Sequence, residues 1–193
     1  MTVRLGKDQW IGAGLRALAR EGIEGVRVER LASSLGLTKG SFYWHFADRS
    51  ALHSAMLEEW AARATGEVIA RVEGKGGGAS EKLLNLIRIV VADDGRVDRA
   101  VRGWAAHDAL AGAATDRVDQ WRVAYLCGLF SGLGFSERES LARSRMIYQA
   151  VIGQIMMVAA APRDERIADW VDVIFPMLVY RPANQPELGR KSS

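Results

Sequence analysis

The stretch LGLTKGSFYWHF, residues 35–46, places four aromatic rings within five consecutive positions. A helix turns by about 100° per residue, so Phe42 and Phe46 lie about 40° apart and share one face. Tyr43 and Trp44 then lie on the opposite side. We therefore expect two rings to close a small core and two rings to face outward. The alternative is that Tyr43 and Trp44 pack beneath the following helix as ordinary core residues.

The residues around this stretch predict a helix-turn-helix. Residues 8–20 carry apolar side chains at three- and four-residue steps, and residues 28–35 repeat the pattern in a shorter segment, which indicates two amphipathic helices. Gly36 favours a tight turn, because glycine adopts left-handed backbone conformations at little cost. Thr38 is a good N-cap, so we expect the next helix to run from there to about His45. Two short helices joined by a glycine-containing turn form a helix-turn-helix.

Composition and charge narrow the class of protein. The chain has 193 residues, 49% hydrophobic and 25% charged, which is typical of a globular protein, and its four prolines suit a helical one. Cys127 is the only cysteine, which excludes an internal disulfide and a cysteine-based zinc site. The first residues lack the apolar run of a signal peptide, and no apolar tract is long enough to span a bilayer. We expect a cytoplasmic protein without membrane, metal or cofactor.

The excess positive charge lies in the first quarter of the chain. Residues 1–50 contain eight Lys and Arg against five Asp and Glu, whereas the rest of the chain has equal numbers of each. The net charge of +3 is therefore confined to the predicted helix-turn-helix, where a polyanion would bind. Chance alone could also produce so small a bias.

The order VERLASSLGLTKGSFYWHFADRSAL resembles the DNA-binding domain of TetR-type transcriptional regulators, over about residues 8–57. The resemblance implies an all-α fold: a three-helix DNA-binding domain with a helix-turn-helix, residues 1–50, and a larger helical effector-binding and dimerisation domain, residues 51–181. Residues 182–193 are expected to form a flexible tail. By this resemblance the residues that face double-stranded operator DNA are Arg27, Thr38, Lys39, Gly40, Ser41, Tyr43, Trp44, His45 and Arg49.

One position departs from the family pattern. Such regulators usually have Thr or Ser at the start of the second helix, where this chain has Arg27. The missing cap costs about 1 kcal/mol if nothing replaces it, while a full charge is gained near the DNA backbone. Two neighbouring assignments stay open: Glu29 reads a cytosine amine or is only solvated, and His45 donates to phosphate or is an ordinary helix-end histidine.

The second part of the chain also reads as helical. Helices are expected over residues 50–73, then 81–93, 97–110 and from Thr115, as the N-cap, to about 134, with the glycine-rich joint at 74–80. Two later segments, residues 144–161 and 167–180, are apolar on nearly every face and must be buried all round. Pro176 is expected to bend the last helix.

The two apolar segments predict a homodimer, because a core can cover one side of each helix and a partner subunit the other. The resemblance implies the same, since the last two helices of TetR-type regulators pair across a four-helix bundle. The alternative is an internal hairpin in a monomer. The residues expected at the dimer interface are Tyr148, Ile152, Gly153, Met156, Trp170, Ile174 and Met177.

The resemblance also implies a cavity for a small, largely apolar effector between the middle helices. Residue types that line such pockets are aromatic or sulfur-containing with a few polar groups. The candidates are Trp60, Trp104, His107, Tyr125, Phe130 and Met146. Residues of these types are, however, more often part of the core than of a ligand pocket.

The leading hypothesis is a homodimeric repressor that binds a palindromic operator and is released by its effector. An enzyme using His107, Asp108 and Cys127 is the hypothesis from another class. Against it, the sequence contains no phosphate-binding loop, nucleophile elbow or zinc motif. A third hypothesis keeps the fold but removes the effector, giving a DNA-binding regulator or an architectural protein.

Overall fold

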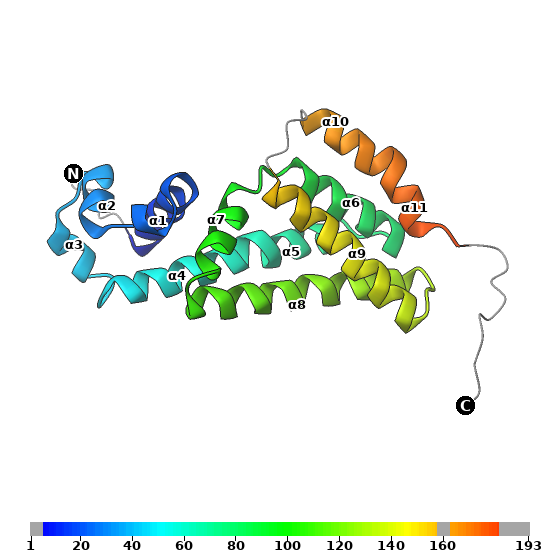
Figure 1. The fold of residues 1–193 in the computed structure, drawn as a ribbon, viewed down its shortest axis with the longest axis horizontal. Coiled ribbons are helices and arrows are strands. Elements are labelled where there is room, and N and C mark those ends of the chain that lie inside the picture. Colours follow the sequence, from blue (N-terminus) through cyan, green and yellow to red (C-terminus); the bar gives the residue numbers. More distant parts are fainter. Residues whose placement is uncertain (1–5, 158–162, 182–193) are drawn as a thin grey trace.

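The computed structural model describes residues 6–157 and 163–181. In these two ranges all regular structure is helical, so the predicted all-α fold is confirmed (Figure 1). The first helices form one end of an elongated molecule, and the later helices pack into a bundle at the other end. None of the helices in the described ranges is long and apolar enough to cross a bilayer.

The N-terminal end contains three helices and a short 3-10 turn. Their bounds are α1 (Lys7–Glu21), η1 (Ile23–Gly25), α2 (Val28–Leu35) and α3 (Lys39–Tyr43). Gly36 ends α2 with a left-handed φ of 66°, as the turn requires. The rings of Trp10 and Phe42 meet edge to face at 5.4 Å, and both side chains are fully buried. These contacts pack α3 against α1 and fix its orientation.

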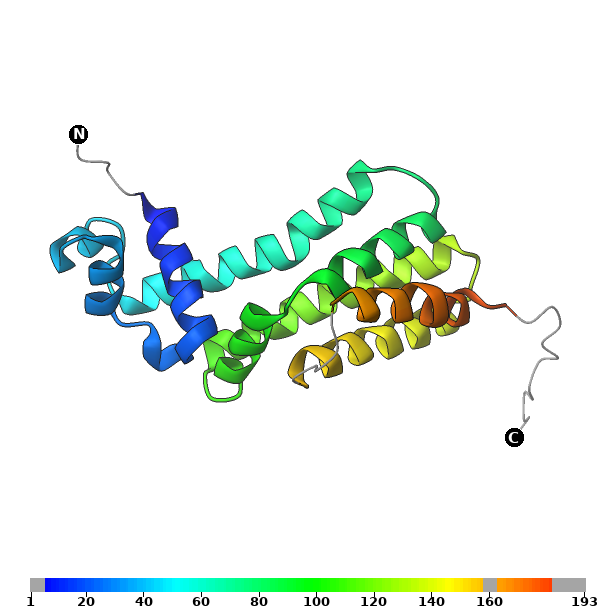
Figure 2. The same cartoon turned by 90° about the horizontal axis from the view of Figure 1, so that it is seen from above.

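A nearly continuous helical rod leaves this domain and enters the bundle (Figure 2). It consists of α4 (Arg49–Ala61), the π-helical turn η2 (Ala62–Gly66) and α5 (Glu67–Gly74). The Asp48 carboxylate caps it by accepting from the backbone N–H of Ala51 at 2.8 Å. The long helix is confirmed, but periodicity did not predict its π-helical turn.

The bundle is built around the antiparallel pair α8 and α9. Its helices are α6 (Ala79–Ala92), α7 (Arg96–Ala105), α8 (Ala109–Gly132) and α9 (Glu137–Met156). Two boundary predictions were wrong here. The helix expected over residues 97–110 ends at Ala105, and α8 begins at Ala109 rather than at Thr115.

Thr115 is not a cap because α8 has already begun nearly two turns earlier, at Ala109. The Asp108 carboxylate accepts from the backbone N–H of Ala111 at 2.9 Å, and this bond starts the helix. Thr115 is buried, and its hydroxyl donates to the carbonyl of Ala111 at 2.8 Å. Such a bond to the preceding turn satisfies a hydroxyl inside a helix, so a cap-type residue is tolerated there.

The last described helical segment packs against α6. It comprises α10 (Arg163–Ala168), the π-helical stretch η3 (Asp169–Ile174) and α11 (Phe175–Val179). The helix departs from α-geometry immediately before Pro176, which lacks the N–H that an α-helix needs. The Arg143 side chain on α9 donates to the carbonyl of Leu178 at 2.6 Å and ties the two segments together. The predicted tail, residues 182–193, and part of the segment 144–161 lie outside the described residues.

Two hydrophobic clusters hold the molecule together. The first starts in the N-terminal domain at Trp10 and Phe42 and continues through α4 to Trp104 on α7 and Val118 on α8. The second lies between α6, α8, α9 and α11, around Phe130. Because the first cluster crosses from one domain into the other, the N-terminal helices are anchored on the bundle by buried apolar surface.

Candidate nucleic-acid interface

Helix α3 and the residues directly after it place their aromatic side chains on two faces. Phe42 and Phe46 are buried and stack on each other at 5.3 Å, whereas Tyr43 is 55% exposed and Trp44 is 89% exposed. The predicted split of the four rings is therefore confirmed. The expectation that Tyr43 and Trp44 pack as core is excluded by their exposure.

Polar groups surround the exposed rings. The Thr38 hydroxyl accepts from the backbone N–H of Ser41 at 3.3 Å, so Thr38 is the N-cap that the sequence predicted. Gly40 is exposed and keeps the backbone open to close approach. The Lys39 ammonium forms an exposed ion pair with Glu29 at 2.6 Å, and this hydrogen bond lowers the pKa of the Glu29 carboxyl. Such exposed pairs are weak, so a phosphate can compete for the lysine.

Three further predicted residues flank this surface. Arg27 occupies the N-cap position of α2 without a capping side-chain bond, and its Nε donates to the carbonyl of Glu24 at 3.0 Å. The lost cap is therefore confirmed. His45 is partly exposed just after α3, and Arg49 is exposed at the start of α4.

Arg49 points toward the junction between the two domains. Its Nε donates to Nε2 of His53 at 3.1 Å, and its Nη2 donates to the carbonyl of Ile23 at 3.2 Å. His53 in turn meets the Trp104 ring edge to face at 5.0 Å. Burial and the neighbouring Arg49 charge lower the pKa of His53, although Asp108 opposes them, so the imidazole favours its neutral form.

A cleft of about 1030 Å³ opens at this junction. Its walls come from the C-terminal end of α1, the turn η1, the first turns of α4 and one face of α7. Arg49, His53 and Trp104 all line it, as does His107. We call it the junction cleft.

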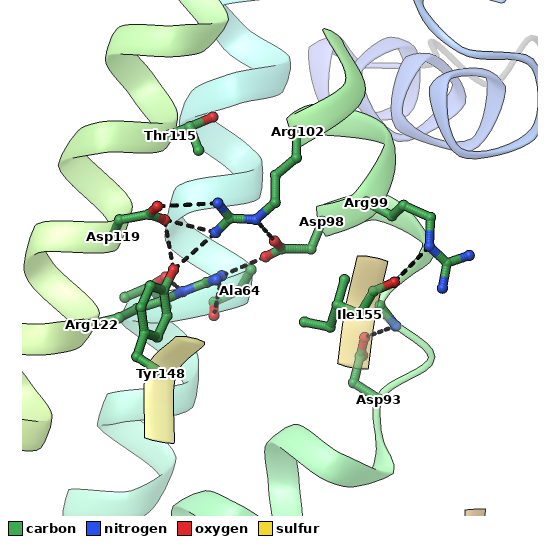
Figure 3. A network of polar contacts seen from close by, with 12 residues as sticks. Ala64, Asp93, Asp98, Arg99, Arg102, Thr115, Asp119, Arg122, Tyr148 and Ile155 are labelled. Atoms are coloured by element: carbon green, nitrogen blue, oxygen red, sulfur yellow. Dashed lines mark hydrogen bonds and ion pairs between the residues drawn. The ribbon is translucent and has the colours of Figure 1, made fainter. Parts of the chain in front are cut away.

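A network of paired charges joins four elements inside the bundle (Figure 3). Arg102 on α7 donates to both carboxylate oxygens of Asp119 on α8, at 2.7 and 3.1 Å, and to Asp98 at 2.7 Å. The Tyr148 hydroxyl on α9 donates to Asp119 at 2.6 Å. Arg122 on α8 completes the network by donating to Asp98 at 2.8 Å. Two arginines and two carboxylates leave it electrically neutral, as buried charges require.

The pKa values in the network follow from this pairing. Burial alone would lower the pKa of Arg102, but the hydrogen bonds to Asp119 and the charge of Asp98 raise it. Burial would raise the pKa of Asp119, but the bonds from Arg102 and Tyr148 lower it. Burial raises the pKa of Tyr148 to about 12. All these groups therefore keep one protonation state near neutral pH.

Arg122 also holds the π-helical turn of the long rod. Its Nη2 donates to the carbonyl of Ala64 at 3.2 Å, and its Nε donates to the hydroxyl of Thr65 at 2.9 Å. A π-helical turn disturbs the regular backbone hydrogen bonds, and here a guanidinium supplies one of the partners. Through Asp98 the same side chain reaches α7, so Arg122 connects the rod with the bundle.

The six predicted effector residues do not line one cavity. Trp60 and Trp104 belong to the first hydrophobic cluster and Phe130 to the second. Tyr125 is partly buried and donates to Glu73 at 2.6 Å. The remaining two are on the surface: His107 lines the junction cleft together with Trp104, and Met146 is 55% exposed on α9.

The seven predicted interface residues do not share one environment. Met156 and Met177 are exposed, and a side chain added at Gly153 would meet nothing within 4 Å. Trp170 and Ile174 pack against the second cluster, and Tyr148 belongs to the charged network. Ile152 lines a groove of about 910 Å³ between α8 and α9.

Sequence reasoning missed the charged network and three arginines of the junction cleft, Arg20, Arg96 and Arg99. The signal for the network was present as acid–base pairs at helical spacing, Asp98 with Arg102 and Asp119 with Arg122. Such pairs are usually solvated, however, and only the packing of α7 against α8 makes them face each other.

The structure does not bring together His107, Asp108 and Cys127, the three residues considered for an enzyme. Asp108 caps the N-terminus of α8, and Cys127 lies farther along the same helix. At the helical rise per residue these two positions are about 28 Å apart, far beyond the reach of one reacting substrate group.

The N-terminal part of the chain is similar in sequence to known bacterial regulatory proteins. Residues 11–56 match the family described as bacterial regulatory proteins, tetR family. The class D tetracycline repressor protein of Escherichia coli is 37% identical over 60 residues, which cover 31% of this chain and 28% of the repressor. The chain thus matches less than a third of the length of this curated relative.

Solved structures resemble the chain over nearly its whole length. A transcriptional regulator from Rhodococcus sp. Rha1 has a TM-score of 0.74 at 18% identity, covering 91% of this chain and 96% of that one. A transcriptional regulator from Saccharomonospora viridis, solved in complex with choline, has a TM-score of 0.68 at 16% identity, covering 86% and 95%. The proteins that this chain resembles are regulators rather than enzymes. Residues 11–56 therefore match the tetR family of bacterial regulatory proteins, and the fold of the whole chain resembles that of these solved structures.

Proposed function

We propose that this protein is a homodimeric transcriptional repressor that binds a palindromic operator and is released by a small molecule. The observation that carries the proposal is the exposed face of α3, where Tyr43 and Trp44 stand over the buried Phe42 and Phe46. Exposed aromatic side chains of this size, on a helix that the core holds in place, are suited to a binding surface.

In this proposal α3 enters the major groove. Gly40 and Ser41 approach the base edges, Trp44 contacts thymine methyl groups and Tyr43 donates to a phosphate. Lys39 leaves Glu29 for the DNA backbone, and Thr38 and His45 add polar contacts. The guanidinium groups of Arg27 and Arg49 bind the flanking phosphates, because their donors match phosphate geometry.

The dimer is proposed to form through α9 and α11. Exposed apolar side chains lie on both segments, with Met146 and Met156 on α9 and Val173 and Met177 on the last segment. Gly153 lies on the same part of α9 and allows a close approach of helices. A two-fold dimer would present its two copies of α3 to successive major grooves, about one helical turn apart.

The effector is proposed to be small and largely apolar and to bind in the helical domain. The groove between α8 and α9 supports this, because Val123, Ala124, Cys127 and Leu141 give it mainly apolar walls. The choline complex of the similar Saccharomonospora viridis regulator is a further support. Release follows if the effector favours a dimer geometry whose α3 spacing no longer matches the operator. Repression takes place in the cytoplasm, where the single cysteine stays reduced.

The first experiment is affinity selection of genomic DNA fragments by the purified protein at physiological salt. We expect one palindromic sequence from the wild type. Tyr43→Ala should weaken binding to it about tenfold, and Lys39→Ala should lower the salt dependence by about one counterion. Recovery of sequence-blind, salt-labile fragments would favour an architectural protein of the same fold. A palindrome that no tested small molecule releases would favour an effector-independent regulator.

A further inference from the structure

The junction cleft is basic, and its charge is not explained by the fold. It is lined by the arginines Arg20, Arg49, Arg96 and Arg99 and by the carboxylates Glu24 and Asp108. Four cations against two anions give its lining a net charge of +2 when its histidines are neutral, and it stays basic although Arg96 forms an exposed ion pair with Asp94 at 3.3 Å, just outside the lining. The charged network described above is neutral by contrast, so the junction cleft is the more attractive place for an anion.

Several guanidinium donors in the cleft have no partner among the residues that the structure describes. Within residues 6–157 and 163–181, Arg20 forms no hydrogen bond and no ion pair. Arg99 uses only its Nε, which donates to the carbonyl of Ile155 at 2.7 Å, and its two terminal nitrogens stay unpaired in the same ranges. Arg49 likewise keeps one terminal nitrogen for another acceptor.

The acidic groups of the cleft do not neutralise these donors. Asp108 is directed to α8, where it accepts from the Ala111 N–H at 2.9 Å. Glu24 forms no ion pair within the described ranges. The unpaired guanidinium groups are therefore available to an external anion, and Arg offers fork-shaped donors that match carboxylate and phosphate oxygens.

Gly103 is a second, independent feature of the cleft. It lies inside α7 on the cleft wall, and a Cβ added there would meet nothing within 4 Å. Glycine inside a helix destabilises it by about 1 kcal/mol relative to alanine, and no packing contact within the chain requires glycine here. Its absent side chain leaves the helix backbone open to a ligand between Arg99 and His107.

We propose that the junction cleft binds a small organic anion with at least two negative charges, a polycarboxylate or a phosphate monoester. The charged groups bind Arg20, Arg99 and the remaining terminal nitrogen of Arg49. The rest of the molecule lies against Gly103 and the apolar surfaces of Ile23 and Trp104. The volume of about 1030 Å³ is at the upper end of the range for small-molecule sites.

Occupation of the cleft opposes DNA binding through Arg49. This part of the inference rests on the proposed function, in which Arg49 contacts an operator phosphate. An anion in the cleft competes with DNA for the same guanidinium group. Linkage then requires DNA to weaken anion binding by the same factor as the anion weakens DNA binding.

The test is calorimetric titration of the full-length protein, without DNA, with citrate and with glycerol 3-phosphate at fixed ionic strength. Acetate is the singly charged control. We expect one of the two multivalent anions to bind at least tenfold more tightly than acetate, and the better probe identifies the class. Arg20→Gln should weaken binding about three- to tenfold, whereas Arg16→Gln, also exposed on α1 but outside the cleft, should not.

Two variants separate this effect from misfolding. Asp108→Asn keeps a capping side chain but removes a negative charge, so binding should become about three- to tenfold tighter. Gly103→Leu should raise the thermal stability of α7 and yet weaken anion binding. The proposal is overturned if neither multivalent anion binds better than acetate, or if Arg16→Gln weakens binding as much as Arg20→Gln. It is also overturned if only duplex DNA senses Arg20, because the cleft would then belong to the DNA interface.

The DNA arm is measured separately, by adding the better anion to a preformed DNA complex. Weaker DNA binding in the wild type, with no such loss in Arg20→Gln, supports the competition. Calorimetric binding without any effect on a specific DNA complex retains the site and rejects the antagonism. Absence of a specific DNA complex rejects the proposed function and leaves the calorimetric result standing.

Discussion

Trp44 and Phe42 are only two positions apart in the sequence, yet one aromatic side chain is almost completely exposed to solvent and the other is completely buried. Trp44 is 89% exposed, whereas Phe42 is fully buried against Trp10. Truncating the first removes little packing, and truncating the second leaves a cavity. The two positions therefore separate DNA binding from stability within one short helix.

We expect Trp44→Ala to leave the free energy of unfolding within about 0.5 kcal/mol of wild type while weakening specific DNA binding about tenfold. Phe42→Ala should lower the free energy of unfolding by about 3–5 kcal/mol. Denaturant unfolding and fluorescence anisotropy with the selected palindrome measure the two quantities. Equal loss of stability in both variants would contradict the assigned faces.

His53 makes stability depend on pH. Because its pKa is lowered in the folded state, the unfolded chain binds its proton first as the pH falls. The stabilisation is thus complete above the unfolded pKa of about 6.5 and is lost as the pH falls toward the folded value. Acidification from pH 7.5 to 5.5 should lower the melting temperature more in the wild type than in His53→Gln. Parallel melting curves for the two proteins would refute this.

For individual residues, the sequence predicted the burial of some side chains correctly but did not predict the contacts of others. The faces of Phe42 and Trp44 follow from helical period alone, which acts within one element. The bond from Arg49 to the carbonyl of Ile23 depends on where α4 meets η1, and a pattern of residue types does not contain that distance. The DNA-contacting roles came from family resemblance and stay predictions.

Among the elements, the π-helical turn η2 is the one most dependent on a single distant side chain. Arg122 donates to Ala64, to Thr65 and to Asp98, and its side chain is only 16% exposed. Removing a buried charged partner is expensive because the groups left behind lose their hydrogen bonds without regaining water.

Arg122→Met should therefore lower the free energy of unfolding by about 3–5 kcal/mol, since it leaves Asp98 with Arg102 alone and the Ala64 carbonyl without its guanidinium. Arg117→Met, on the same helix and exposed, is the matched control and should change stability by less than about 0.5 kcal/mol. Denaturant unfolding compares them. If Arg122→Met unfolds at the denaturant concentration of the control, the network is not a structural connection.

Element boundaries show where sequence reasoning fails for a physical reason. Asp108 and Thr115 are both N-cap residue types, and both stand before apolar positions that suit a helix. The choice depends on the tight turn after α7, which ends at Ala105 and brings the chain back along α8. That turn is fixed by packing between the helices rather than by local preference.

Considered as a whole, the molecule has an uneven distribution of exposed apolar surface. Val173, Met177 and Tyr180 are exposed along the last segment, and Met156 and Met157 along the end of α9. A monomer rarely keeps this much large apolar surface in contact with water, which supports a partner subunit.

We expect Met177→Glu to convert the proposed dimer into a monomer with little loss of folding, because the side chain is 67% exposed. Specific DNA affinity should fall at least about a hundredfold, since two linked half-site contacts become independent. Light scattering after size-exclusion chromatography gives the mass. Leu110→Glu, another exposed apolar position outside these segments, should stay dimeric; a monomeric Leu110→Glu or a dimeric Met177→Glu would place the interface elsewhere.

The continuous rod of α4, η2 and α5 would convert a small tilt at one point into a larger displacement at its far end. From Ala64, where Arg122 holds the rod, to its beginning at Arg49 the distance is about 22 Å at the helical rise per residue. A tilt of the rod by only about 10° around Ala64 would move its N-terminal end by about 4 Å. Displacements too small to disturb the core around the charged network would thus reach the end that is proposed to face DNA as a shift comparable with one base-pair step.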